Sequence, residues 1–265
     1  MKTVLTIAGS DCSGGAGIQA DLKTMIANGC YGMSVITSLT AQNTTGVTSI
    51  EKVTPAFLAD QLDAVLSDIT PDAVKIGMVP DAALIEVIVL KLTEFKACNI
   101  VTDPVMVATS GAALSDGGSI STLVRELLPI SAIVTPNIPE AEVLAGMKIK
   151  TGEDKLEAAR IICDKGGCAV LVKGGHGTAG ADDVLFEKGE YYEFPSRRID
   201  NPNTHGTGCT LSSAIACNLA KGMRMQDAVQ TAKDYVTGAI AAGLDLGRGR
   251  GPLDHGYDIK TRYKN

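Results

Sequence analysis

The chain has 265 residues, with 24 Lys and Arg against 30 Asp and Glu, which gives a formal net charge of −6. Apolar residues make up 45% of it and charged residues 20%, which excludes a disordered chain because enough apolar side chains are present to build a core. The acidic balance argues against broad binding of nucleic acid or of an anionic membrane, since no basic surplus is available to neutralise phosphates.

Cysteine and histidine give no sign of a metal cluster or a disulfide framework. The seven cysteines contain no C-x-x-C pair and the three histidines lie far apart in the sequence, so neither a zinc cluster nor a set of disulfides is expected. The first apolar stretch, Val4–Ala8, is too short for the core of a signal peptide or for a membrane span. We therefore expect a cytoplasmic protein with no membrane partner.

Short β-branched segments alternate with segments of helical length along nearly the whole chain. Apolar strands without regular polar alternation, separated by helices, are typical of a parallel sheet covered on both faces. We therefore predict a single α/β domain over residues 1–265. In chain order the predicted elements are strand Val4–Ala8, helix Ile18–Asn28, strand Ser34–Ala41, helix Ala56–Asp68, strand Ala73–Ile76, helix Asp81–Phe95, strand Ile100–Asp103, helix Ile120–Leu128, strand Ile133–Thr135, helix Glu140–Gly146, helix Asp154–Lys165, strand Ala169–Val172, a hairpin of Asp183–Glu187 and Tyr191–Phe194, and the helices Gly208–Lys221 and Gln226–Ala242.

The segment Gly9–Gly17 follows the first predicted strand and leads into a helix that contains Asp21. Its glycines allow backbone N–H groups to approach a ligand at the N-terminus of that helix. The segment does not match G-x-G-x-x-G, and the chain contains no G-x-x-x-x-G-K-[ST], so neither a Rossmann turn here nor a Walker A loop is predicted. A tight strand-to-helix turn without a ligand is the alternative.

Polar residues also follow the next strands. Gln42 comes after the second predicted strand, and its amide suits the edge of a heterocycle because it offers one acceptor and two donors; a solvated turn is the alternative. Asp103 closes the strand Ile100–Asp103, and Glu140 follows Ile133–Thr135. Two carboxylates at adjacent strand ends are able to hold Mg²⁺, which takes few carboxylates and keeps several waters, although Asp103 would equally suit a helix cap or an Asx-turn.

Lys173 comes directly after the strand Ala169–Val172 and is followed by glycines. A lysine in such a place acts as a point charge on phosphate oxygens. His176, three residues later, is expected to be a loop residue rather than a catalyst. Since ligands of parallel sheets bind at the carboxyl ends of the strands, these residues are expected to share one site.

The strongest motif is the polar, glycine-containing segment Asn203–Ala214, which leads straight into an apolar helix. The backbone N–H groups of residues 206–209 would point at one spot and form an anion hole for a transferring phosphoryl group. The helix dipole would favour the thiolate of Cys209 at the start of this helix. The structural alternative is that Cys209 is a small buried apolar residue, as we expect for the other six cysteines.

Eight segments, in this order and over essentially the whole chain, resemble the hydroxymethylpyrimidine/phosphomethylpyrimidine kinases of thiamin biosynthesis, which belong to the ribokinase-like superfamily. They are long enough that chance agreement is not credible. The segments are Ile7-Ala-Gly-Ser-Asp11, Ser13-Gly-Gly-Ala-Gly-Ile-Gln-Ala-Asp-Leu-Lys-Thr24, Ala41-Gln-Asn-Thr44, Lys75-Ile-Gly-Met78, Asp103-Pro-Val-Met106, Thr135-Pro-Asn-Ile-Pro-Glu-Ala141, Lys173-Gly-Gly-His176 and Asn203-Thr-His-Gly-Thr-Gly-Cys-Thr210.

This resemblance implies a three-layer α-β-α sandwich with a mostly parallel central sheet, usually as a homodimer, which uses ATP and Mg²⁺. Most sugar kinases of the superfamily carry an aspartate base where Cys209 stands, and a cysteine there resembles the pyrimidine kinases and a related set of pyridoxal kinases. The implied roles are pyrimidine binding for Gly9, Asp21, Gln42, Met78 and Val105, Mg²⁺ binding for Asp103 and Glu140, ATP binding for Asn137, Lys173 and Thr207, and catalysis for Lys173, Gly206, Gly208 and Cys209.

The resemblance implies that the chain phosphorylates 4-amino-5-hydroxymethyl-2-methylpyrimidine to its monophosphate and then to its diphosphate. The first alternative is a pyridoxal or pyridoxine kinase of vitamin B6 salvage. Pyridoxal kinases of this group tend to carry methionine at the position of Gln42 and to lack the lysine seen at Lys173, so both residues favour the pyrimidine. A non-catalytic nucleotide-binding or pyrimidine-binding module is the alternative from another class.

Overall fold

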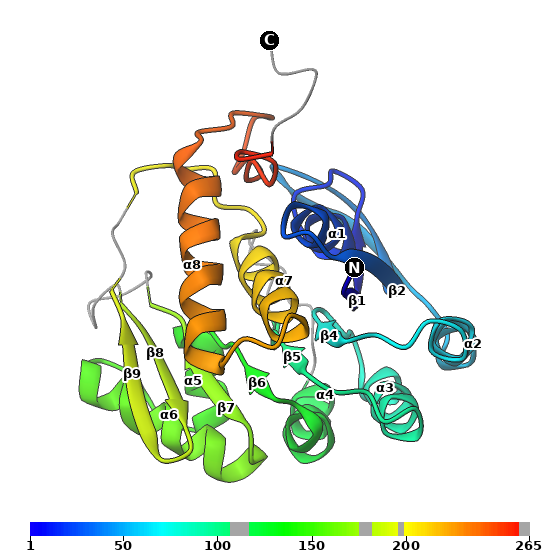
Figure 1. Cartoon of the computed structure of the whole chain (residues 1–265), viewed down its shortest axis with the longest axis horizontal. Helices are drawn as coiled ribbons and strands as arrows, with labels where there is room; N and C mark the ends of the chain where they lie inside the picture. The colour runs from blue at the N-terminus through cyan, green and yellow to red at the C-terminus, as the bar shows by residue number, and fades with distance from the viewer. Residues whose placement is uncertain (107–116, 175–181, 196–198, 260–265) are drawn as a thin grey trace.

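A nine-stranded sheet runs through the centre of the protein in a computed structural model that describes residues 1–106, 117–174, 182–195 and 199–259 (Figure 1). The strand order is β3-β2-β1-β4-β5-β6-β7-β8-β9. The strands are β1 Thr3–Asp11, β2 Tyr31–Asn43, β3 Gly46–Lys52, β4 Ala73–Ile76, β5 Ile100–Thr102, β6 Ile133–Val134, β7 Ala169–Val172, β8 Asp183–Glu187 and β9 Glu190–Phe194.

The middle of the sheet is parallel and its two edges are antiparallel. Strands β2, β1, β4, β5, β6 and β7 run in one direction. Strand β3 pairs antiparallel with β2 at one edge, and the β8–β9 hairpin continues antiparallel from β7 at the other. The predicted mostly parallel α/β sheet is therefore confirmed.

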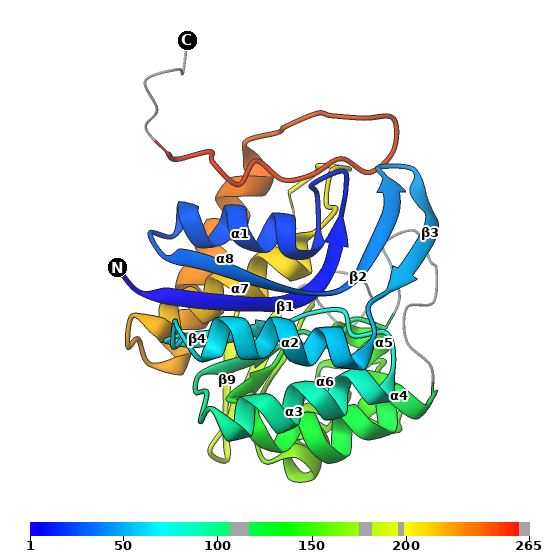
Figure 2. The same ribbon diagram turned by 90° about the vertical axis from the view of Figure 1, so that its right-hand side faces the viewer.

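Helices cover both faces of the sheet, as Figure 2 shows with α1, α7 and α8 on one side and α2 to α6 on the other. This arrangement confirms the predicted three-layer sandwich. The helices are α1 Gly17–Ala27, α2 Pro55–Leu66, α3 Ala82–Glu94, α4 Gly117–Thr122, α5 Ile138–Ala145, α6 Gly152–Gly166, α7 Thr207–Ala220 and α8 Met225–Ala241.

Neighbouring residues of one strand serve opposite layers of the core. Val4 packs in the cluster with α7 and α8, whereas Leu5 packs in the cluster with α2 and α3. In the same way Ile133 joins the α7–α8 side and Val134 joins the α5–α6 side. Side chains alternate between the faces of a strand, and because both faces are covered, most residues of the central strands are apolar.

Side-chain caps explain where several helices begin. The hydroxyl of Thr54 accepts from the N–H of Phe57 before α2, and Asp81 accepts from Leu84 before α3. The helices α5 and α6 begin with reciprocal capping boxes, in which an Asn or Thr N-cap and the third helical residue satisfy each other's backbone N–H groups. Such caps use donors that the first turn of a helix leaves without partners.

The structure differs from the predicted elements in three places. Strand β3 was not predicted; it is an edge strand without a clear apolar face, and the turn after β2 sets its pairing. The predicted helix Ile120–Leu128 is replaced by α4, a π-helical turn over Leu123–Leu127 and a 3-10 turn over Leu128–Ile130. Strand β1 continues three residues past Ala8 into the glycine-rich segment, where the register shifts after Ala8 and Ser10 and Asp11 still pair with β2.

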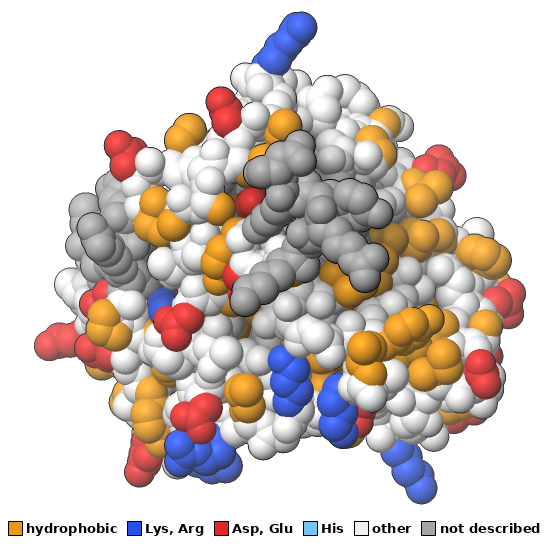
Figure 3. Space-filling view, turned by 45° about the horizontal axis from the view of Figure 1, so that its top comes forward, with side chains coloured by type: hydrophobic (Ala, Val, Ile, Leu, Met, Phe, Trp, Pro, Cys, Tyr) orange, Lys and Arg blue, Asp and Glu red, His pale blue; other side chains and the backbone are white. Residues whose placement is uncertain are grey.

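The surface gives two further observations. No helix in the described ranges is long and apolar enough to span a membrane. On the face in Figure 3, the visible basic side chains stand apart from one another among acidic and apolar ones rather than forming a continuous patch.

Candidate active site

The segments that leave the parallel strands lie side by side at one edge of the sheet. Each is hydrogen-bonded to the neighbouring strand: the N–H of Gly77 donates to Ile7, the N–H of Asp103 donates to Ile76, and the N–H of Lys173 donates to Pro136. The predicted motifs therefore meet at the carboxyl edge of the sheet, where ligands of such folds bind.

A buried ion pair occupies the centre of this edge. The Nζ of Lys173 lies 2.8 Å from Oδ1 of Asp103, which also accepts a hydrogen bond from Thr135 at 3.2 Å. The side chain of Asp103 is 3% exposed and that of Lys173 is 16% exposed. A Cβ atom on Gly208 would lie 3.3 Å from Nζ of Lys173 and 3.4 Å from Oδ2 of Asp103. Glycine at 208 therefore lets the start of α7 approach the ion pair.

A second buried carboxylate, Glu140, lies beside this pair. Its Oε2 accepts from the N–H of Asn137 at 2.8 Å, and the side chain of Asn137 accepts from the N–H of Glu140 in return. Burial raises the pKa of Glu140; the charge of Lys173 opposes this rise and that of Asp103 adds to it. The capping box thus fixes Glu140 within electrostatic range of both partners.

The chemistry of Asp103 and Glu140 fits a magnesium ion. Both are buried oxygen donors, the ligand type that Mg²⁺ prefers, and the ammonium group of Lys173 lies near both of them. Within the described part of the chain, no three His, Cys, Asp or Glu residues gather into a group able to hold a metal ion. Such a site would therefore need phosphate oxygens and water as further ligands, as Mg²⁺ sites in kinases do.

The start of α7 is held against the glycine-rich segment Gly9–Gly17. Gly206, the N-cap of α7, has φ +80°, and a Cβ there would lie 1.9 Å from the carbonyl oxygen of Gly15. Only glycine accommodates both the left-handed backbone and this approach. One turn further on, the N–H of Gly17 donates to the sulfur of Cys209. The N-termini of α1 and α7 therefore meet at the same point.

Cys209 is surrounded by charged groups at this point. The pKa of its thiol is raised to about 11, mainly by burial; the charge of Lys75 acts against this rise, whereas those of Asp21 and Asp103 contribute to it. Burial acts against the predicted effect of the helix dipole, because it favours the neutral thiol over the thiolate. Cys209 lies at the start of α7, and its role in the site stays a prediction.

Asp11 and His205 join the two glycine-containing segments. Oδ2 of Asp11 lies 3.0 Å from Nε2 of His205 and accepts from the N–H groups of Gly15 and Ala16. Burial tends to raise the pKa of Asp11, but hydrogen bonds from His205, Ser13 and Ala16 lower it to about 2. Neither residue was assigned a role from the sequence, although both stand inside the quoted motifs.

A fully buried ion pair lies behind Cys209. Both oxygens of Asp21 contact Nζ of Lys75, at 2.9 and 2.8 Å, and they also accept from the hydroxyls of Ser213 and Thr6. Asp21 and Lys75 are 0% exposed. The role of Lys75 was missed, although a lysine within the apolar strand β4 is a signal for a buried partner. Asp21 was expected to bind pyrimidine, and the structure places it beneath the site with both oxygens engaged.

The other residues expected to bind pyrimidine lie along the ends of β1, β2 and β4. A Cβ on Gly9 would lie 3.5 Å from the sulfur of Met78, so these two residues are in contact range. The side-chain nitrogen of Gln42 donates to the hydroxyl of Thr40 at 2.7 Å, and the backbone carbonyl of Gln42 accepts from the thiol of Cys12 at 3.1 Å. Gln42 therefore lies beside the glycine-rich segment.

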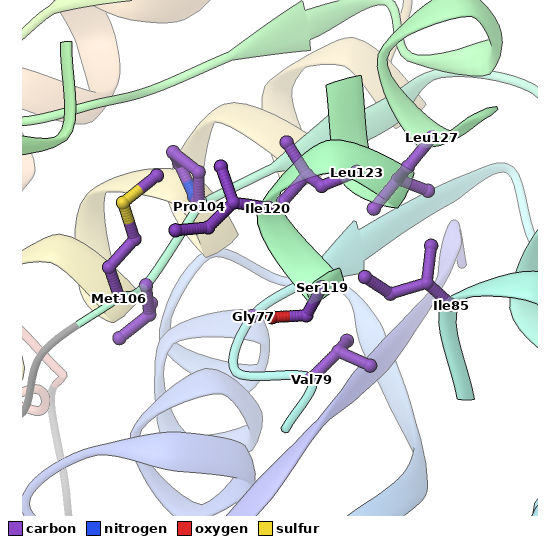
Figure 4. A pocket seen from close by; sticks show the side chains of 10 residues that line it. Gly77, Val79, Ile85, Pro104, Met106, Ser119, Ile120, Leu123 and Leu127 are labelled. Carbon is purple, nitrogen blue, oxygen red and sulfur yellow. The ribbon is translucent and has the colours of Figure 1, made fainter. Parts of the chain in front are cut away.

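Val105, the fifth of these residues, lies in a small pocket beneath the segment that follows β5 (Figure 4). The pocket is apolar and contains none of the other four residues expected to bind pyrimidine. It is lined by Gly77, Val79, Ile85, Pro104, Val105, Met106, Ser119, Ile120, Leu123 and Leu127. His176, expected to be a loop residue, lies outside the described residues.

The chain after α8 returns to this edge, which the sequence did not predict. Nε2 of His255 lies 3.1 Å from the hydroxyl of Thr210, the residue after Cys209, and the carbonyl of His255 accepts from Tyr235. Burial, together with the nearby charge of Lys23, lowers the pKa of His255 to about 4. A neutral histidine therefore ties this segment to the first turn of α7.

Comparison with known proteins agrees with this geometry. The family model described as phosphomethylpyrimidine kinase matches residues 11–254. The chain is 54% identical to the bifunctional thiamine biosynthesis protein of Geobacter sulfurreducens over 98% of its own length, and it spans about half (54%) of that relative. It is 49% identical to the hydroxymethylpyrimidine/phosphomethylpyrimidine kinase of Rhizobium meliloti, covering 95% of this chain and 96% of the relative.

Solved structures show the same relationship. The crystal structure of phosphomethylpyrimidine kinase from Clostridium difficile is 44% identical, with a TM-score of 0.82, and covers 91% of this chain and 100% of that one. The pyridoxal kinase of Bacillus subtilis, solved as an ADP complex, is 36% identical, with a TM-score of 0.89 and coverage of 97% and 98%. The predicted ribokinase-like kinase fold and phosphotransferase class are thereby confirmed, and the chain belongs to the phosphomethylpyrimidine kinase family.

Proposed function

We propose that this chain transfers phosphoryl groups from ATP to 4-amino-5-hydroxymethyl-2-methylpyrimidine and then to the resulting monophosphate. The observation that carries the proposal is the ion pair of Lys173 and Asp103 against Gly208 at the start of α7. It combines a cation, a carboxylate and backbone donors of a helix N-terminus at one place. These are the parts that phosphoryl transfer needs, since its catalysis is mostly positioning and charge neutralisation.

In this proposal Asp103 and Glu140 hold a magnesium ion together with the phosphates of ATP. When bound, Mg²⁺ neutralises charge on the β- and γ-phosphates. Lys173 contacts the same phosphates as a point charge, with Asn137 and Thr207 beside it. The N–H groups of residues 206–209 then stabilise the phosphoryl group as it is transferred.

The two steps need different help from Cys209. The first acceptor is an alcohol, which benefits from a base within reach. The second acceptor is a phosphate oxygen, already largely ionised at neutral pH because its second pKa is roughly 6. We therefore assign the proton of the first acceptor to Cys209. Cys209 accepts this proton as the thiolate, after its own proton has been released to water, and the nearby charges of Lys75 and Lys173 favour that form.

The proposal places the aminopyrimidine between the ends of β1, β2 and β4. Gly9 and Met78 would form the apolar wall, and Val105 would close it from β5. The side-chain amide of Gln42 donates one hydrogen bond to Thr40. Its oxygen is an acceptor that suits the exocyclic amino group of the pyrimidine. Pyridoxal has no amino group at the corresponding ring position, so Gln42 favours the pyrimidine.

The experiment is coupled ADP release, with purified protein offered hydroxymethylpyrimidine, its monophosphate and pyridoxal in parallel. Turnover of both pyrimidines with little turnover of pyridoxal is expected. Lys173→Met should reduce the turnover of both pyrimidines by about a hundredfold or more. Lys188→Met, on the exposed β8–β9 turn, should leave this turnover unchanged. Dominant turnover of pyridoxal would instead identify a vitamin B6 kinase, and binding without turnover would identify a non-catalytic module.

The proposal also covers the organisation of the protein. We take residues 1–265 as one kinase domain, because a single sheet contains β1 to β9. We also expect a homodimer in the cytoplasm, on the resemblance to the pyrimidine kinases. Light scattering on the purified protein would test the oligomeric state, with a mass near that of one chain contradicting it.

A further inference from the structure

The chain after α8 carries the sequence Gly247-Arg-Gly-Arg-Gly-Pro252, which no part of the mechanism above uses. We call residues 244–255 the C-terminal strap. Figure 2 shows it leaving α8, running over the outer side of α1 to the β2–β3 turn, and coming back. It therefore approaches the carboxyl edge of the sheet beside the end of β2.

The strap is fastened at both ends of the site. At one end the N–H groups of Arg248 and Gly249 donate to the hydroxyl of Thr44, at 3.2 and 3.1 Å, and the N–H of Arg250 donates to its carbonyl at 3.0 Å. Thr44 stands two residues after Gln42. The strap is therefore attached at the rim of the proposed pyrimidine pocket.

At the other end the strap is bound to the segment that precedes the anion hole. The N–H of Gly251 donates to the side chain of Asn203 at 2.8 Å, and the N–H of His205 donates to the carbonyl of Gly251 at 3.1 Å. His205 directly precedes Gly206. The strap thus spans the distance between the substrate side and the phosphate side of the site.

The alternation of glycine and arginine has a steric cause. A Cβ on Gly249 would lie 2.1 Å from the carbonyl oxygen of Thr44, and one on Gly251 would lie 2.8 Å from Oδ1 of Asn203. Glycines are therefore needed where the strap touches the protein. The backbone N–H groups of residues 248–251 are all used for fastening, so only the side chains of Arg248 and Arg250 are free to bind a ligand.

Both arginines are exposed, and within the described residues neither forms an ion pair. No carboxylate of the described residues therefore competes with a ligand for these two guanidinium groups. Guanidinium groups match phosphate oxygens bidentately and hold them by charge-assisted hydrogen bonds. Because the backbone is already held in place, little ordering is needed when a phosphate binds.

We propose that Arg248 and Arg250 bind the phosphate of the monophosphorylated pyrimidine and so select the substrate of the second step. The inference rests on the proposed function and names the substrate group that the strap recognises. The same chemistry would suit a phosphate of ATP, and the two sources differ in which step depends on the arginines. The substrate of the first step carries no phosphate and does not need the strap.

The test compares steady-state kinetics of the double variant Arg248→Gln/Arg250→Gln with the wild type in both steps. We expect KM for the monophosphate to rise by about ten- to a hundredfold, the loss of one or two charge-assisted hydrogen bonds. KM for hydroxymethylpyrimidine and for ATP should change by less than about twofold. The conservative variant Arg248→Lys/Arg250→Lys should recover part of the loss, because it restores charge without the bidentate geometry.

Arg224→Gln is the matched control, since Arg224 is an exposed arginine at the start of α8 that pairs with Asp227, and it should leave both steps unchanged. A rise in KM for ATP in both steps would assign the arginines to the nucleotide and overturn the proposal. Unchanged kinetics of the second step would overturn it as well. If the wild type phosphorylates neither pyrimidine, the proposed function fails and this inference fails with it.

Discussion

Cys209 is buried among charges of both signs. Lys75 and Lys173 favour its thiolate, Asp21 and Asp103 oppose it, and burial raises the pKa of the thiol to about 11. A base with a raised pKa is mostly protonated at pH 7, but it has a larger driving force for taking a proton once it is deprotonated. The side chain therefore suits a reaction in which the acceptor is a weakly acidic alcohol.

Cys209→Ala should separate the two steps at the residue scale. We expect kcat for hydroxymethylpyrimidine to fall by about a hundredfold or more, the usual contribution of a positioned base, and kcat for the monophosphate to fall by less than about tenfold. Single-turnover assays of each step would measure both values. Cys163→Ala removes another partly buried thiol, in α6 away from the site, and should change neither. Equal losses in both steps would contradict the assignment of Cys209 as a base and leave it only a packing role in the anion hole.

Helix α7 depends on the close approach of two loops at its first residue. Gly206 has a left-handed backbone and touches the carbonyl of Gly15, while His205 beside it is held by Asp11. The anion hole therefore requires that the segments Gly9–Gly17 and Asn203–Ala214 dock correctly. Loss of this docking would affect the start of α7 as a whole, because the same few contacts orient all its N–H groups.

Gly206→Ala should abolish both phosphorylation steps. The added methyl group would lie 1.9 Å from the carbonyl oxygen of Gly15, so the two loops must separate and the N–H groups lose their alignment. Gly146→Ala is the matched control: Gly146 has φ +78° at the end of α5, and a Cβ there meets nothing within 4 Å. It should cost about 1–2 kcal/mol of unfolding free energy from backbone strain alone, with activity retained. Activity in Gly206→Ala comparable to the control would contradict the docking argument.

The sequence allowed prediction of the parallel strands and of the residues that follow them. This worked because buried strands are mostly apolar, so that the polar residues after them mark where the chain leaves the sheet. The carboxyl ends of parallel strands share one edge of the sheet. Contacts between distant segments were not predictable: Lys75 meets Asp21 across 54 residues, and His205 meets Asp11 across 194. No periodic pattern marks such pairs. The edge strand β3 was missed for a related reason, since its mostly exposed residues lack the alternation of a half-buried strand.

On the scale of the whole molecule, the C-terminal strap packs against segments of the proposed site. His255 is bound to Thr210 in α7 and to Tyr235 in α8, while Gly251 is bound to Asn203. The strap therefore connects the last part of the chain with both helices of one layer and with the β2–β3 turn. The attachment of the strap through His255 depends on this buried histidine staying neutral.

This dependence predicts how stability varies with pH. The pKa of His255 falls from an ordinary value near 6.5 to about 4 on folding, mainly through burial, so between these values the unfolded chain binds more protons than the folded one. Stability should therefore be complete above about pH 6.5 and decrease as the pH falls toward 4, by up to about 3 kcal/mol. Asp11, whose pKa is lowered to about 2, adds a further loss only below about pH 4.

Urea unfolding at a series of pH values between 7 and 4 would measure this decrease. His255→Gln keeps a hydrogen-bonding group near Thr210 but has nothing to titrate in this range, so its unfolding free energy should be lower at pH 7 and flatter toward pH 4. The variant and the wild type should then converge in stability at low pH. A wild-type curve that is flat from pH 7 to 4, or a variant curve parallel to it, would show that the strap does not couple His255 to global folding. Convergence would place the histidine among the interactions that hold the strap on the folded protein, because only a group buried in the native state contributes in this way.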